Sequence, residues 1–355
     1  MNCAQGLRYL RTLQRSFSWR LFTTSVFLCV VLRGDAQQAS GPGELTGTLR
    51  IVGTDTMKEL LQRWTEAFEA AHPHVTFEVT ANGALTAAPA LAGDAADLVP
   101  LGRELTPAEL TLFHKSHGYE PTQIPVALGS YDRSGRTVAL AFFVQESNPI
   151  ARLSLAQLER VYCVAKNGKA PERSITWGDL GVRGGWSALP VHAIGVNFPD
   201  GISNFIRLQL CPDRELLPGI RTEHTGGTVN VLERIVDDVS RDPAAIGYAG
   251  FANQRPGARL VPVSRDGTHY FSGTRAEVAA GEYPLTRFIY MDSDRKPGQP
   301  LSDLQKAFLA FVLSRAGQAL VPADGIYMPL PEKILKHDCR DIQQLAGQEE
   351  ASCGL

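Results

Sequence analysis

The sequence predicts an α/β fold in which helices cover the faces of sheets. Two observations support this prediction. Apolar strand-like runs are repeatedly followed by a turn and an amphipathic helix, first up to residue 136 and again from residue 137. The chain of 355 residues is also long enough for two domains of ordinary size.

The first elements are an apolar strand at residues 49–52 and the segment GTDTM at residues 53–57. Thr54 or Asp55 is expected to cap the helix that follows. Apolar residues then recur at helical spacing and predict one buried face: Met57, Leu60, Leu61, Trp64 and Phe68. A helix that starts directly after a strand points unpaired N–H groups beyond the end of that strand, where an anion can bind.

The strand and helix pattern then repeats. Alternating apolar and polar residues at 75–79 predict a half-buried strand, followed by a glycine-containing turn and a short alanine-rich helix. Residues 97–101 predict another short strand. Thr106, Pro107 and Glu109 form a capping box with proline at the first helical position, which predicts a helix start.

The second set of elements begins near Thr137 and rests on the same signals. Strands are expected at residues 138–144, 191–195 and 245–250. Helices are expected from Ser154, through residues 205–210, at residues 229–240, and as one long helix at residues 302–319 with Gln305 at its capping-box position.

The first 36 residues are typical of a secretory signal peptide. An apolar run at residues 21–32 follows four arginines, Arg8, Arg11, Arg15 and Arg20. Small residues at 34–36 predict cleavage after Ala36. The run is shorter than the roughly 20 apolar residues of a membrane span, so an uncleaved anchor is the alternative interpretation. The mature chain is expected to be soluble and exported.

Charge and cysteine content exclude two classes of function. Without residues 1–36, which hold five basic residues and one acidic residue, 30 basic and 36 acidic residues remain. This acidic balance excludes nucleic acid as an expected partner. The four remaining cysteines are spaced unlike a zinc site. In an exported chain three pairings are possible, of which Cys163 with Cys211 and Cys339 with Cys353 are favoured.

Six segments, taken together and in order, resemble the PstS-like phosphate-binding proteins of ABC importers. They are GTDTM at 53–57, YEPTQIPVAL at 119–128, SNPI at 147–150, TWGDL at 176–180, AIGYAG at 245–250 and GQ at 317–318. The resemblance implies a two-lobe type II periplasmic-binding-protein fold, with mixed sheets flanked by helices and a ligand cleft between the lobes.

The resemblance also implies an organisation of the chain. We expect a signal peptide at 1–36, a first part of lobe I at 47–136, lobe II at 137–248, a second part of lobe I at 249–335 and a tail at 336–355. The expected location is the periplasm, the expected partners are inorganic phosphate or a similar oxyanion and an inner-membrane ABC permease, and the protein is expected to be a monomer. No enzyme activity, cofactor or metal is implied.

Phosphate binders of this family hold the oxyanion with helix-start N–H groups, hydroxyls and an arginine opposed by an aspartate. Carried over by position, the expected ligand-binding residues come from three loops of lobe I and one loop of lobe II. They are Thr54, Asp55, Thr56, Gly83, Ala84, Thr86, Arg103, Asn197, Asp200, Gly201, Ile202 and Ser203.

The sequence departs from the family pattern at this expected site. The second loop has Ala84 and Leu85 where the family has serines, and Val196 stands in place of the family's arginine. The family's Ser-Gly-Thr is replaced by an Asp-Gly-Ile that begins at Asp200. Each lost hydrogen bond to a charged group costs about 1.5–3 kcal/mol. Arg103 is expected to compensate from the other lobe.

Other interpretations of these residues stay open. Asp200 is also a suitable helix N-cap, and Arg103 a suitable surface residue beside Glu104. The histidines show no metal-ligand spacing, and no serine lies in a nucleophile elbow. Besides phosphate capture, the loss of family residues from the loop at 196–202 fits an envelope sensor or interaction protein that no longer binds phosphate. An exported hydrolase would need a nucleophile with a base, which the sequence does not show.

Overall fold

The computed structural model describes residues 44–169, 173–196, 200–220 and 230–336. The expected signal peptide, the tail from residue 337, Asn197 and the expected Cys339–Cys353 pair lie outside the described residues. In the part of the chain that is described, no helix is long and apolar enough to cross a membrane.

Strands and helices alternate in the first part of the chain, as the sequence predicts. They are β1 (Gly47–Gly53), α1 (Lys58–Ala71), β2 (Val75–Ala81), α2 (Ala87–Ala92), β3 (Val99–Leu101), α3 (Pro107–His117) and β4 (Thr122–Leu128). β1 and β2 pair in parallel, and a parallel bridge joins Ile51 to Leu98 just before β3. The carboxyl ends of β1 and β3 therefore lie at the same edge, which brings the loops after them together.

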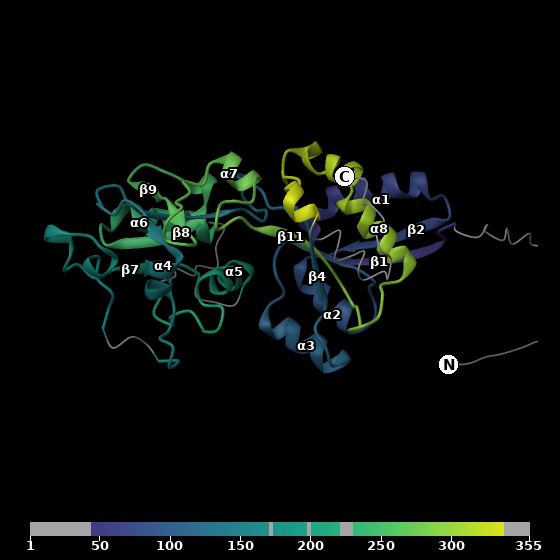
Figure 1. The fold of residues 1–355 in the computed structure, drawn as a ribbon, viewed down its shortest axis with the longest axis horizontal. Helices are drawn as coiled ribbons and strands as arrows, with labels where there is room; N and C mark the ends of the chain where they lie inside the picture. Colours follow the sequence, from purple (N-terminus) through teal and green to yellow (C-terminus); the bar gives the residue numbers. More distant parts are fainter. Residues whose placement is uncertain (1–43, 170–172, 197–199, 221–229, 337–355) are drawn as a thin grey trace, which may run out of the picture. The chain divides into compact units, whose positions relative to one another are not determined.

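The second set of strands forms a separate four-stranded sheet with the order β7-β8-β5-β9. The strands of this sheet are β5 (Leu140–Gln145), β7 (His192–Ile194), β8 (Ala245–Gly250) and β9 (Ala258–Val261). Two short strands, β6 (Leu153–Ser154) and β10 (Val263–Ser264), pair with each other. The helices of this part of the chain are α4 (Leu155–Tyr162), α5 (Gly201–Leu210), α6 (Val231–Arg241) and α7 (Arg275–Ala279). Helix α6 covers β8 and β5 (Figure 1).

The chain then returns to the first set of strands. β11 (Phe288–Ser293) lies between β3 and β4 and is antiparallel to both. The expected lobe boundaries stay a prediction. β9, which follows the expected boundary at residues 248–249, is hydrogen-bonded to β5, so the sheet that contains β5 continues to Val261.

Capping boxes define several helix starts where the sequence predicts them. In α3, Thr106 accepts the N–H of Glu109 while the Glu109 carboxylate accepts the N–H of Thr106. Ser154 and Gln157 cap α4 in the same way. At the first loop, Thr54 caps the short helical turn Asp55–Met57 that leads into α1. Reciprocal side-chain and backbone bonds of this kind are local in sequence, so they can be predicted from it.

The prediction of one long helix at residues 302–319 is wrong. The structure has two helices there, α8 (Asp303–Leu313) and α9 (Arg315–Ala319). Ser314 between them has an extended backbone with ψ 164°, and its hydroxyl accepts the N–H of Gly317 to start the second helix. A Cβ on Gly317 would lie 2.2 Å from the Phe311 carbonyl oxygen. The second helix can therefore begin this close to the end of the first only with glycine at position 317.

Two further sequence predictions are confirmed inside the core. Cys163, which ends α4, forms a disulfide with Cys211, which ends α5, across a Cα–Cα distance of 5.7 Å. Trp64, one of the residues of the predicted buried helix face, is fully buried, as is Trp177. The Trp64 ring N–H donates to the Gly317 carbonyl oxygen at 2.9 Å, which ties α1 to α9.

Candidate functional site

The first loop, after β1, is closely packed against the end of β3. The Thr54 N–H donates to the Pro100 carbonyl oxygen at 3.0 Å, and the Thr54 and Thr56 hydroxyls lie 3.0 Å apart. Thr54 is 3% exposed, whereas Asp55 is exposed to solvent. The Thr56 carbonyl oxygen accepts hydrogen bonds from Arg136 and Tyr327. The hydroxyls of this loop are thus held in fixed positions at the strand end.

The second loop, after β2, offers few polar groups. Gly83 has φ 106°, a left-handed conformation that favours glycine. The Thr86 hydroxyl donates to the Gly83 carbonyl oxygen at 2.8 Å and so closes the turn. Ala84 is partly buried, and Leu85 is 82% exposed. The two family serines are therefore replaced by apolar side chains at the start of α2.

Arg103, in the third loop, is part of a bidentate ion pair. Its Nη1 and Nη2 atoms each lie 2.7 Å from a carboxylate oxygen of Glu109. The Arg103 side chain is 11% exposed, so its interpretation as a surface residue is wrong. Burial tends to raise the pKa of Glu109, but hydrogen bonds from Arg103 and the Thr106 N–H hold this pKa below its usual range. Arg103 is thus an arginine opposed by a carboxylate.

The start of α5 carries the expected residues of lobe II. Asp200 Oδ1 accepts the N–H groups of Ile202 at 2.9 Å and of Ser203 at 2.7 Å. The interpretation of Asp200 as a helix N-cap is therefore confirmed. Its carboxylate occupies the place at a helix N-terminus that suits an anion, because the same N–H groups and the positive end of the helix dipole face it.

Contacts across the two sides of the site hold α5 in place. A Cβ on Gly201 would lie 2.4 Å from Arg103 Cδ, so the arginine stem packs directly on this glycine. The Asn204 amide donates to the Leu105 carbonyl oxygen at 3.3 Å, and Arg287 Nη2 donates to the Gly201 carbonyl oxygen at 3.3 Å. The third loop and the start of α5 are therefore direct neighbours.

A cavity of about 900 Å³ lies where these elements meet. Five of the expected ligand-binding residues line it: Ala84, Arg103, Asp200, Gly201 and Ser203. Thr54, Asp55, Thr56, Gly83, Thr86 and Ile202 are not among its lining residues. The first loop still borders the third, since a Cβ on Gly102 would lie 3.7 Å from Thr56 Oγ1.

Several residues of this region were not predicted from the sequence. Glu109 and Arg207 line the cavity, and Arg287, which immediately precedes β11, is 4% exposed behind the start of α5. Within the described residues, Arg287 Nε has no hydrogen-bond partner, and its guanidinium carbon lies 5.1 Å from the Phe205 ring centroid. Burial lowers the pKa of Arg287. No local motif marks these residues, because only the folded chain brings them to α5.

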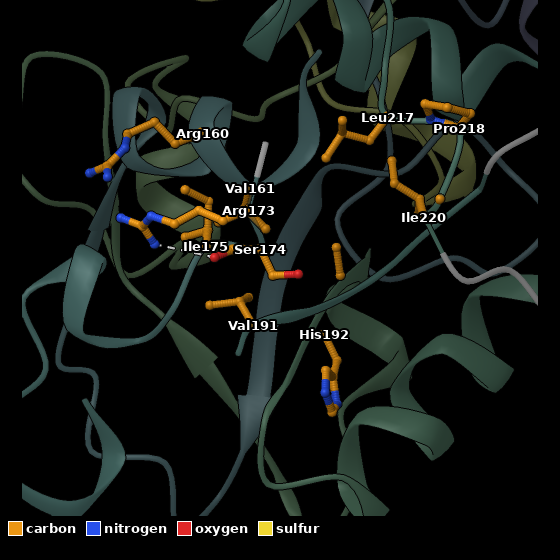
Figure 2. A pocket seen from close by; sticks show the side chains of 12 residues that line it. Arg160, Val161, Arg173, Ser174, Ile175, Val191, His192, Leu217, Pro218 and Ile220 are labelled. Carbon is orange, nitrogen blue, oxygen red and sulfur yellow. Dashed lines mark hydrogen bonds between the residues drawn. The ribbon is translucent and has the colours of Figure 1, made fainter. Parts of the chain in front are cut away.

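A second cavity of about 420 Å³ lies between α4 and the segments that flank β7 (Figure 2). Arg160, Arg173 and His192 are its cationic or titratable lining residues. Arg173 forms a bidentate pair with Asp179, with N–O distances of 2.6 and 2.7 Å, and Arg160 donates to the Asp179 carbonyl oxygen. None of the expected ligand-binding residues lines this cavity.

The chain is similar to proteins of one family in sequence and structure. The family model described as PBP superfamily domain matches residues 38–316. The phosphate-binding protein PstS of Pseudomonas aeruginosa is 31% identical over 307 residues, which cover 86% of this chain and 89% of that protein. The crystal structure of PstS from Borrelia burgdorferi has a TM-score of 0.50 and 17% identity, covering 80% of this chain and 98% of that chain. This likeness shows the two-lobed α/β fold.

Proposed function

Because this chain belongs to the PBP superfamily and to its PstS phosphate-binding proteins, we propose that it captures phosphate or a related oxyanion for an ABC importer. The cavity beside Arg103 and α5 is the proposed binding site. Capture and release involve no chemical step, so no enzyme activity and no cofactor form part of the proposal. The proposed partner is a permease in the inner membrane, which receives the ligand from the monomeric protein in the periplasm.

The single observation that best supports this binding site is the position of Arg103. This arginine comes from the first part of the chain, lines the cavity and contacts Gly201 at the start of α5. An anion held there would meet a guanidinium and a helix N-terminus at once, both of which stabilise negative charge. The hydroxyls of Thr54 and Thr56 lie outside this cavity, and Thr56 borders the third loop at Gly102; we propose that they join the ligand set when the lobes close.

The proposed mechanism is a shift between open and closed arrangements of the two lobes. An oxyanion that contacts both Arg103 and the loop from Asn197 to Ser203 gains contacts only when these segments are close together. A ligand shifts such an equilibrium by the difference between its affinities for the two states. The permease would then recognise the closed, loaded form.

A second candidate function is an envelope sensor or interaction protein that no longer binds phosphate. The hydrogen bonds of Asp200 favour it, because the aspartate already occupies two N–H groups that a ligand would need. The Arg103–Glu109 pair favours it too, since the arginine charge is already compensated. The two candidates differ in one measurable property, which is the affinity for oxyanions.

The test is thermal unfolding of the purified protein in phosphate-free buffer, titrated with phosphate, sulfate, arsenate and phosphonates. A ligand present at about 100 times its dissociation constant raises the free energy of unfolding by about 2.7 kcal/mol. A shift specific to phosphate would support the importer function. The absence of a shift with every oxyanion would reject it and leave the sensor or interaction protein.

Two variants assign the site. Arg103→Ala should abolish the shift, and Arg103→Ala combined with Glu109→Gln should do so without leaving Glu109 as an unpaired buried charge. Arg173→Ala is the matched control, because Arg173 makes the same bidentate contact with a carboxylate but lines the other cavity (Figure 2). Loss of binding in the control alone would move the site to that second cavity.

A further inference from the structure

Three side chains from distant parts of the chain converge outside both cavities. Asp94 lies in the turn after α2, His117 is the last residue of α3, and Asp294 follows β11. Each offers one ligand atom, and the three atoms lie within 4.8 Å of one another. Sequence spacing could not reveal this group, because a metal-ligand motif is recognised only when its members are close in sequence.

The ring of His117 is held in one orientation. It stacks on Phe113 with ring centroids 4.3 Å apart and an interplanar angle of 10°, and 12% of its side chain is exposed. Its Nδ1 lies 3.4 Å from the Phe113 carbonyl oxygen, and its Nε2 faces the two carboxylates. Histidine ligands of metals are commonly oriented by such a carbonyl contact.

Neighbouring side chains hold the Asp294 carboxylate and the turn that carries Asp94. The Tyr119 hydroxyl donates to Asp294 Oδ1 at 2.7 Å, which leaves Oδ2 toward His117. Arg50 donates to the Asp94 carbonyl oxygen at 2.8 Å and binds the Asp97 carboxylate, so the turn that carries Asp94 is anchored to β1. The Asp294 carboxylate is thus oriented by a partner of its own, whereas Asp94 is positioned through its backbone.

The distances from His117 to the two carboxylates fit a shared cation. His117 Nε2 lies 3.3 Å from Asp94 Oδ1 and 3.5 Å from Asp294 Oδ2. A single Nε2–H would serve both acceptors at distances beyond the usual range of about 2.7–3.2 Å. The edge of a tetrahedron with metal–ligand bonds of about 2.0–2.1 Å is about 3.3–3.4 Å.

We propose that Asp94, His117 and Asp294 bind one divalent transition-metal ion of the zinc class, with water completing the coordination. One imidazole and two carboxylates suit this class, whereas magnesium and calcium prefer oxygen ligands alone. The ion would cross-link the turn after α2, the end of α3 and the exit of β11. Its role would be to stabilise the sheet that carries the Arg103 loop, independently of oxyanion binding.

The test is isothermal titration of chelator-treated protein, purified without a histidine tag, with zinc chloride, followed by thermal unfolding with and without zinc. We expect one high-affinity equivalent and a raised unfolding midpoint. His117→Gln, Asp294→Asn and Asp94→Asn should each weaken zinc binding at least tenfold. The exposed turn residue Asp94 keeps the test valid if a change at the more buried positions prevents folding.

His114→Gln is the matched control, because His114 is on the same helix, is half exposed and lies 3.4 Å from a single carboxylate of Glu120. It should bind zinc like the wild type. No zinc binding by the wild-type protein, or equal binding by folded His117→Gln, would overturn the proposal. Stabilisation at low pH that His117→Gln removes, without any zinc binding, would instead identify an ion pair of protonated His117 with both aspartates.

Discussion

Replacing Asp200 by serine should strengthen oxyanion binding. In the structure, Asp200 Oδ1 accepts the N–H groups of Ile202 at 2.9 Å and of Ser203 at 2.7 Å. A phosphate at this helix start would compete with the carboxylate for the same donors and would be repelled by its charge. Serine keeps N-cap ability, since Ser and Asp are comparable caps, so the helix should remain intact, and its neutral hydroxyl can rotate away from the two N–H groups when an anion binds them.

The magnitude follows from these two bonds. A hydrogen bond to a charged group contributes about 1.5–3 kcal/mol, so two donors that pass from the neutral hydroxyl to the ligand represent at most about 3–6 kcal/mol of ligand interaction. At about 1.4 kcal/mol per tenfold change, the affinity of Asp200→Ser for phosphate should rise by roughly a hundredfold to ten-thousandfold. Imperfect alignment of the ligand would place the result near the lower value.

The assay is isothermal titration of wild-type protein, Asp200→Ser and Asp200→Asn with phosphate. Asparagine keeps the oxygen acceptor and removes only the charge, so Asp200→Asn should show a smaller gain than serine. If folded Asp200→Ser has the same phosphate affinity as the wild type, the N–H groups of α5 are not part of a phosphate site, and the reasoning fails.

Three further predictions follow from the same structure. Since the pKa of Glu109 is lowered in the folded protein, its stabilising contribution is present above the unfolded pKa and is lost as the pH falls through the folded value. Midpoints measured between pH 5 and pH 3 should therefore fall less steeply for Glu109→Gln, and equal slopes would contradict the ion pair. Replacing both Cys163 and Cys211 by serine should lower the denaturant-measured free energy of unfolding by about 4 kcal/mol, because the disulfide closes a long loop with a sequence separation of 48; a loss below about 1 kcal/mol would contradict this loop-closure argument. The described cavity lining has two arginines and three carboxylates and no histidine, so it favours a ligand with less negative charge. The phosphate affinity measured by calorimetry should therefore rise as the pH is lowered from 8 to 6 and phosphate takes up a proton. An affinity that falls over this range would instead favour a site for the dianion.

Much of the fold could be predicted because its signals are local. The apolar periodicity of α1 and the capping box of α3 depend on residues within one or two turns. The interruption of the helix at Ser314 was not predicted, because apolar residues continue on both sides of it. The residues of the Ser314–Gly317 hydrogen bond are also common inside helices. Local rules therefore located most elements and failed where one element passes directly into another.

The segments that carry the family resemblance encode packing more than ligand contacts. Gln318 is 5% exposed, donates to the Val126 and Val312 carbonyl oxygens and accepts the Leu330 N–H. In the segment TWGDL, the Asp179 carboxylate closes a local turn by accepting the N–H and hydroxyl of Thr176. Such residues explain why the resemblance identifies the fold, whereas the expected ligand site stays a prediction.

The position that holds the family's arginine shows why the site itself could not be predicted. Val196 is fully buried, lines the cavity, and donates its N–H to the Tyr248 hydroxyl at 2.8 Å. It forms an apolar wall there, so the cationic groups that contact Gly201 at the start of α5 come from elsewhere, namely Arg103 in the third loop and Arg287 before β11. Both reach Gly201 only through the folding of the whole chain. Comparing the sequence with the family motif position by position shows that the arginine is absent at 196. It does not show which charged residues the fold brings to the same helix start.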